Sequence, residues 1–131
     1  LIPEYEEVGR YLNLTKTTLG GVLFEQAQAD RDNGNIEEAV AKLKRASQLA
    51  PADDRIQTGL KVAEKDLQIK NAQESQRLYK EGLEAFLGGQ TAKAEQTWKK
   101  SLELDPTNEE ALKAISKLEE QRKYGDSDKQ Q

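Results

Sequence analysis

A spacing of 55 residues recurs along this chain of 131 residues. Gly34 and Gly89 each lie between two stretches in which apolar residues have helical spacing, and Pro51 and Pro106 each follow the second stretch. Glycine favours the left-handed backbone that ends many helices, and proline cannot continue a helix. The spacing therefore predicts an internal duplication of a unit made of a helix, a tight turn, a second helix and a stop.

The residues that coincide after this shift lie at predicted turns and core positions. The matched pairs are Leu23 and Leu78, Gly34 and Gly89, Ala39 and Ala94, Lys44 and Lys99, Leu49 and Leu104, Pro51 and Pro106, and Glu64 and Glu119. The first copy predicts helices over about 19–32 and 36–49. The second copy predicts a helix that ends at Gly88, a helix over about 91–104, and a third helix from Asn108 to about Tyr124.

The stretch between the copies has no proline and no strong turn signal. Its first apolar residues keep a helical spacing, but the segment from Lys70 to Arg77 is almost wholly polar. We expect one helix of about 35 residues, roughly 52 Å long, with a solvated middle. A bend near Asn71 is the alternative.

The two ends of the chain carry weaker signals. The spacing of the apolar residues in 1–19 predicts a short amphipathic helix, which Gly9 and the threonines at 15–18 weaken. The polar segment 125–131 is expected to be disordered. The predicted organisation is therefore 1–19, an N-terminal helical segment; 20–53, hairpin 1; 54–74, an extended helix; 75–108, hairpin 2; 109–124, a C-terminal capping helix; and 125–131, a tail.

Composition limits the chemistry that the chain can perform. It has no cysteine and no histidine, which excludes thiol nucleophiles, disulfides, zinc fingers and a Ser-His-Asp triad. We therefore predict a protein that is not an enzyme and that binds neither a cofactor nor a metal ion. The net charge of −4 disfavours nucleic acid as a partner, and no apolar run is long enough to insert into a membrane. The absence of methionine indicates a processed product or an excised fragment.

Each predicted pair of helices resembles the tetratricopeptide repeat (TPR), a helical hairpin of about 34 residues. The residues that carry the resemblance in 20–53 are Leu23, Ala27, Gly34, Ala39, Leu43, Ala46 and Pro51. In 75–108 they are Leu78, Gly82, Gly89, Ala94, Trp98, Ser101 and Pro106. The resemblance implies an all-α fold of TPR-like hairpins, in which small residues let two helices approach closely.

Two features depart from the family pattern. The hairpins of the family normally follow one another directly, whereas here 21 residues intervene, and two hairpins are fewer than the three or so that a stable array needs. We therefore expect each hairpin to be completed by its own third helix, by another chain, or by other parts of a parent protein.

The resemblance implies a binding surface on the first helix of each hairpin. In the second copy this surface would contain Tyr79, Leu83, Phe86 and Leu87, and in the first copy Phe24, Gln28 and Arg31. The second copy thus has an apolar stripe beyond the one that its own hairpin needs. We predict a non-catalytic protein–protein interaction module or scaffold that binds a peptide segment or helix of a partner protein.

The alternative is that this second apolar face packs against another helix of the chain or a second protomer. The chain would then be a self-associating structural element, such as a homodimer that exchanges hairpins. The Gln-rich helices and the absence of cysteine suit a soluble protein of the bacterial cytoplasm or cell envelope equally well.

Overall fold

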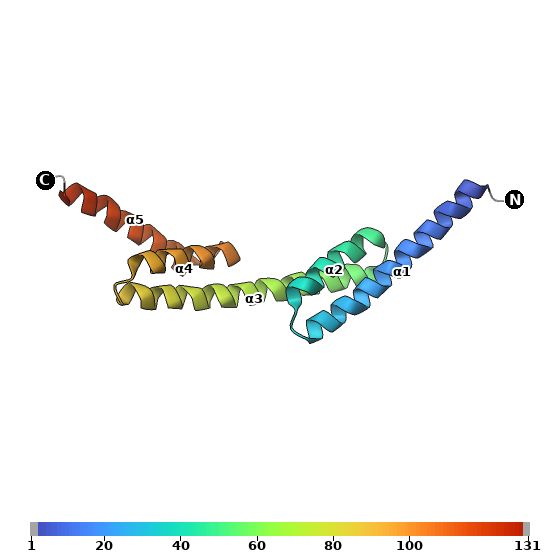
Figure 1. Cartoon of the computed structure of the whole chain (residues 1–131), viewed down its shortest axis with the longest axis horizontal. Coiled ribbons are helices and arrows are strands. Elements are labelled where there is room, and N and C mark those ends of the chain that lie inside the picture. The colour runs from blue at the N-terminus through green and yellow to red at the C-terminus, as the bar shows by residue number, and fades with distance from the viewer. Residues whose placement is uncertain (1–2, 130–131) are drawn as a thin grey trace. The chain divides into compact units, whose positions relative to one another are not determined.

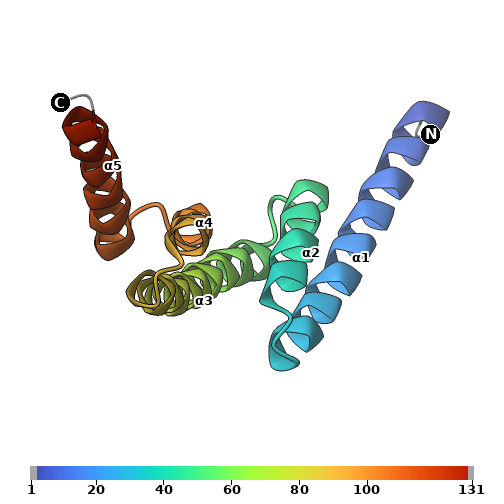
Figure 2. The same ribbon diagram turned by 60° about the vertical axis from the view of Figure 1, so that its left-hand side comes forward.

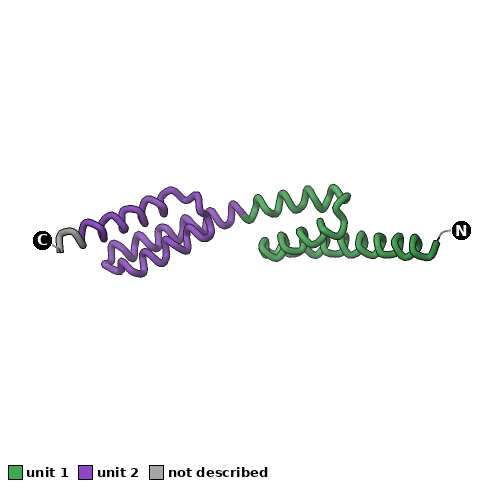
Figure 3. The backbone as a smooth tube through the Cα atoms, turned by 90° about the horizontal axis from the view of Figure 1, so that it is seen from above, with its two compact units in different colours: residues 1–67 green, residues 68–131 purple. Residues whose placement is uncertain are grey.

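The computed structural model describes the backbone of residues 3–129 and the side chains of residues 3–125. This part of the chain contains α-helices and no strand, so the predicted all-α fold is confirmed (Figure 1). The helices are α1 (Glu4–Asp32), α2 (Ile36–Leu49), α3 (Asp54–Leu87), α4 (Thr91–Leu104) and α5 (Glu109–Lys129). They belong to two compact units, unit 1 (Leu1–Leu67) and unit 2 (Gln68–Gln131), and α3 contributes to both (Figure 3).

The same turn closes the hairpin of each unit. Gly34 has φ +82° and Gly89 has φ +83°, the left-handed region in which a side chain is strained. The amide of Asn35 donates to the carbonyl of Asp30 (2.7 Å), and that of Gln90 donates to the carbonyl of Ala85 (2.8 Å). These bonds satisfy carbonyls at the helix end that would otherwise lack a partner, so the glycine spacing marks two equivalent turns.

Unit 1 buries its apolar side chains between α1, α2 and the first part of α3. Gly20 lets α1 approach the end of α2, since a Cβ added there would lie 3.1 Å from the Cβ of Ala50. The buried residues of the two adjoining clusters are Ala27, Ala39, Val40, Leu43 and Ala63, and Ala46, Ala50 and Ile56.

Unit 2 has the corresponding arrangement around Trp98 of α4. The indole lies against Gly82 of α3, and its Nε1 donates to the carbonyl of Tyr79 (3.1 Å). Ala85, Ala94 and Leu118 complete the buried cluster. A glycine is needed at position 82 because a Cβ there would overlap the indole ring.

Burial repeats at the spacing of 55 residues, including in the third helix of each unit. The equivalent buried pairs are Ala27 and Gly82, Ala39 and Ala94, Leu43 and Trp98, Ala46 and Ser101, Ile56 and Ala111, and Ala63 and Leu118. The two units therefore share one packing plan, to which α3 and α5 contribute in the same way.

A buried polar network joins the three helices of unit 2. The hydroxyls of Ser75 and Ser101 are 2.8 Å apart, and the Ser101 hydroxyl donates to the Ser75 carbonyl (2.7 Å). The side-chain amide of Asn108 donates to the Ser75 hydroxyl (2.9 Å). Because hydrogen bonds satisfy these buried groups, the network fixes the start of α5 against α3 and α4.

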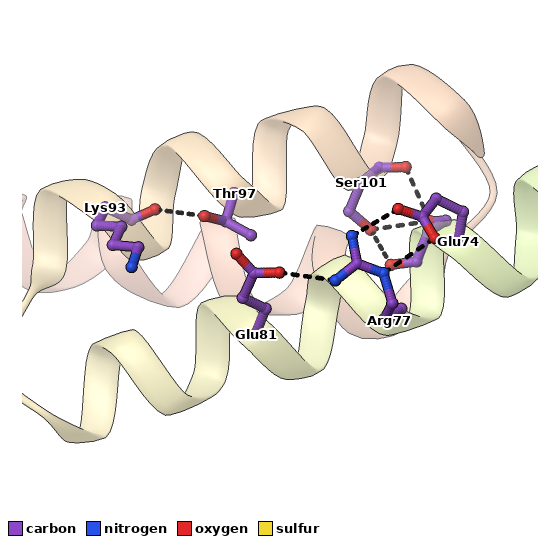
Figure 4. Close-up of polar contacts among 7 residues, drawn as sticks. Glu74, Arg77, Glu81, Lys93, Thr97 and Ser101 are labelled. Carbon is purple, nitrogen blue, oxygen red and sulfur yellow. Dashed lines mark hydrogen bonds and ion pairs between the residues drawn. The ribbon is translucent and has the colours of Figure 1, made fainter.

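Charged side chains cover the polar stretch of α3. Arg77 donates to the carboxylates of Glu74 (2.6 Å) and Glu81 (2.9 Å), one turn to either side (Figure 4). The hydrogen bond from Arg77 lowers the pKa of Glu74, against the opposing effect of desolvation. The predicted central helix is continuous through this stretch from Asp54 to Leu87.

Two predicted helix boundaries are wrong. The segment 1–19 and the first helix of hairpin 1 form one helix, α1 (Figure 2). The threonines do not interrupt it, and the hydroxyls of Thr15, Thr17 and Thr18 each donate to the carbonyl four residues earlier (2.9 Å). At the other end α5 continues past Tyr124 to Lys129. The predicted tail is therefore helical up to Lys129, and residues 130 and 131 lie outside the described part.

Candidate protein-binding groove

An open cavity of about 290 Å³ lies in unit 2 between the second part of α3 and α5, with α4 beneath it. Its lining is apolar along the floor and charged along the α5 rim. The lining residues are Tyr79, Leu83, Phe86, Trp98, Glu110, Lys113, Ala114, Lys117, Leu118 and Gln121. We call this cavity the unit 2 groove.

Packing on Trp98 holds the α3 wall of the groove in place. Tyr79, Leu83 and Phe86 lie on one face of α3 because they are spaced by four and three residues. The rings of Phe86 and Trp98 have centroids 5.9 Å apart and are tilted by 39°. The Leu83 side chain contributes apolar surface that remains 37% exposed.

Contacts at both ends of the groove hold the α5 wall. At its start, the Asn108 side-chain oxygen accepts a hydrogen bond from the amide of Ala111 (3.2 Å), which caps the helix. Nearby, the Gln76 amide lies 3.4 Å from the Glu110 carboxylate. Further along, Arg122 pairs with Glu95 of α4. Since α4 runs back along α3 from the Gly89 turn, α5 follows the same direction as α3 along the groove.

The Glu95 carboxylate is held in its charged form. The hydrogen bond from Arg122 lowers the pKa of Glu95, partial desolvation opposes this effect, and Lys99 (3.3 Å) adds to the lowering. The ion pair therefore stabilises the packing of α5 on α4 when Glu95 is ionised.

Two lysines give the α5 rim a local positive charge. Lys113 and Lys117 are one turn apart, and neither forms an ion pair with another residue that the structure describes. Glu110 lies one turn before Lys113, near the start of α5. The groove thus has an apolar floor, a negative group at one end and positive groups along the rest of one rim.

In unit 1, side chains at the positions equivalent to the groove lining pack on one another or form ion pairs. The Phe24 ring, which replaces Tyr79, packs so closely under α3 that a Cβ at Gly59 would lie 3.1 Å from it. The Arg55 guanidinium lies 5.4 Å from the centre of this ring. Arg31 and Asp66, which replace Phe86 and Gln121, form an ion pair (2.7 Å) across the opening.

The structure brings together three of the residues that the sequence predicts for partner binding. Tyr79, Leu83 and Phe86 line the unit 2 groove, whereas Leu87 lies outside its lining and is 78% exposed. Of the predicted residues in unit 1, Phe24 packs in the core and Arg31 is paired with Asp66, while the Gln28 side chain is exposed.

Sequence reasoning missed the contribution of α4 and α5 to the groove. It considered only the first helix of each hairpin, although Trp98 forms the floor and Lys113 and Lys117 form a rim. The available signal was the helical spacing of the two lysines beside Ala114 and Leu118, which marks a charged edge next to a buried stripe.

No family model, no curated protein and no solved structure matches this chain. Within residues 3–129, none of the helices is both long and apolar enough to cross a membrane. Among the side chains of residues 3–125, no group of three or more carboxylates is placed to hold a metal ion.

Proposed function

We propose that this chain is a non-catalytic interaction module of TPR-like hairpins whose unit 2 groove binds an apolar segment of a partner protein. One observation carries the proposal. The two units share a packing plan, yet the position that Arg31, Arg55 and Asp66 close in unit 1 is an open apolar groove in unit 2. The two units bury equivalent positions, and they differ in the residues that line this surface.

The form of the groove favours a helix or an extended segment as the ligand. Its α3 wall presents Tyr79, Leu83 and Phe86 in a row, and such a row suits a partner with apolar side chains at helical spacing. The groove is concave and mostly apolar, with a few charged groups at its edge, which is the usual form of a binding site.

Self-association is the second candidate function, and a separate observation favours it. The first half of α1 exposes several large apolar side chains, among them Tyr5, Tyr11 and Leu14. A structural element that assembles through this surface would account for them without an outside partner.

A displayed library of amphipathic helical peptides tests the proposed function. The wild-type chain should enrich peptides with apolar residues spaced by three and four positions, and the Leu83→Glu variant should enrich none. Leu87→Glu is the matched control, because Leu87 is on the same helix but outside the groove. Enriched peptides should shift the indole NMR signal of Trp98, the only tryptophan in the chain. Peptides that bind Leu83→Glu as tightly as the wild type would contradict the proposal.

A further inference from the structure

The first half of α1 carries an apolar stripe that nothing in unit 1 covers. Tyr5, Val8 and Leu12 are 75%, 57% and 50% exposed, and their spacing of three and four residues places them on one face of the helix. The stripe lies in the part of α1 that precedes the segment packed on α2, where Gly20 and Ala27 are buried. We call Tyr5, Val8 and Leu12 the α1 stripe.

An acidic edge runs beside the α1 stripe. Glu4 and Glu7 are one turn apart at the start of α1, and the helical periodicity places both on the same side of the stripe. Neither forms an ion pair with another residue that the structure describes. The stripe is therefore apolar with a negative edge, whereas the unit 2 groove is apolar with the positive edge of Lys113 and Lys117.

The spacings of the two surfaces match when the helices run in opposite directions. Tyr79, Leu83 and Phe86 are spaced by four and then three residues, which is the spacing of the α1 stripe read backwards. The first and last residues of each set are seven positions apart, about 10.5 Å along the helix. An antiparallel fit brings Leu12 to Tyr79, Val8 to Leu83 and Tyr5 to Phe86.

Charge selects the same direction. Antiparallel docking puts the acidic start of α1 at the end of the groove that is further from Glu110, beside Lys117. Parallel docking would instead place Glu4 near Glu110, and the two carboxylates would repel each other.

We propose that the α1 stripe of one copy of this chain docks antiparallel to α3 in the unit 2 groove of a second copy. The inference rests on the proposed function, because it takes the groove to be the binding site and names its occupant. The two surfaces differ, so the contact is heterologous. It produces a reciprocal dimer where two copies dock on each other, and longer assemblies where they do not.

Complementation between two full-length variants tests this pairing. Leu12→Asp damages the α1 stripe and leaves the groove intact, and Leu83→Glu damages the groove and leaves the stripe intact. By sedimentation velocity each variant alone should have the monomer mass of 14.7 kDa. An equimolar mixture should form a 1:1 complex, since one good stripe and one good groove remain. The control variants Leu14→Asp, also on an exposed part of α1 but off the stripe, and Leu87→Glu should associate as the wild type does.

A charge exchange tests the direction of docking. Lys113→Glu with Lys117→Glu should weaken self-association on the order of tenfold at low salt. Mixing this double variant with a second double variant, Glu4→Lys with Glu7→Lys, should restore most of the lost affinity.

Three results would overturn the inference. A wild-type chain that stays monomeric at all concentrations would overturn the docking inference. The proposed function of the groove would then be tested by the peptide experiment alone. Association that Leu83→Glu abolishes and Leu12→Asp does not would retain the groove but assign it another occupant. Association that neither variant affects would place the contact elsewhere and would overturn the docking inference, and the peptide experiment would still test the groove.

Discussion

Single small residues determine how closely the helices of each unit approach. At Gly82, an added Cβ would lie 2.6 Å from Cδ1 of Trp98, whereas at Gly21 it would meet nothing within 4 Å. Both residues are helical, so alanine gains about 1 kcal/mol of helix propensity at either site. Packing then decides whether each substitution raises or lowers the free energy of unfolding.

We predict that Gly82→Ala lowers the free energy of unfolding by about 1–2 kcal/mol, because the displaced indole costs more than the propensity gain. Gly21→Ala should raise it by about 0.5–1 kcal/mol. Urea denaturation followed by circular dichroism measures both. A stabilised Gly82→Ala chain would show that Trp98 can move without cost, and the floor of the groove would then not be rigid.

Asn108 serves two purposes, as the cap of α5 and as a donor to Ser75. We predict that Asn108→Ala lowers the free energy of unfolding by about 1–3 kcal/mol, since a cap and a buried hydrogen bond are lost together. Asn35 precedes α2 but makes no side-chain cap bond, so Asn35→Ala should change stability by less than about 0.5 kcal/mol. Equal effects in the same denaturation assay would remove the special role of Asn108.

At the scale of the elements, local signals predicted the turns and missed the lengths of the terminal helices. The turns at Gly34 and Gly89 could be predicted because the left-handed backbone at a helix end depends on the residue itself. The continuity of α1 past Gly9 could not be predicted, because isolated glycines and threonines weaken a helix without ending it. The end of α5 at Lys129 was missed because a polar sequence resembles a tail whether or not it is helical.

Only one wall of the unit 2 groove could be predicted from the sequence. The α3 wall follows from the spacing of Tyr79, Leu83 and Phe86 in one helix. The α5 wall depends on which face of a distant helix packs beside it, and this is decided by the Ser75, Ser101 and Asn108 network and by the Glu95 pair. The spacing of Lys113 and Lys117 marks a charged edge of α5, but it does not show which helix that edge faces.

The pairing of α5 with α4 should depend on pH through Glu95. Arg122 lowers the pKa of Glu95 below its ordinary value of 4.5, so the pair stabilises the fold fully above about pH 4.5. As the pH falls through the lowered pKa, the stabilisation disappears. We predict that wild type exceeds Glu95→Gln in the free energy of unfolding at pH 7 and that the difference shrinks below pH 4.5. A difference that stays constant down to pH 2 would show that the ion pair contributes nothing in solution.

At the scale of the whole molecule, one packing plan is used twice with different surfaces. Unit 1 closes its surface with Arg31, Arg55 and Asp66, and its α1 extends an apolar stripe with an acidic edge. Unit 2 keeps an open apolar groove with a basic edge. The proposed assembly pairs these two surfaces, and the proposed function assigns the same groove to a helix of a partner protein.

The indole signal of Trp98 tests this central claim most directly, because the ring lies in the floor of the groove. In a series of ¹⁵N-labelled samples of rising concentration, we predict that the signal shifts in the wild type and in Leu87→Glu. It should stay fixed in Leu83→Glu. A signal that does not move while the wild-type chain associates would show that the groove remains empty, and would contradict the account.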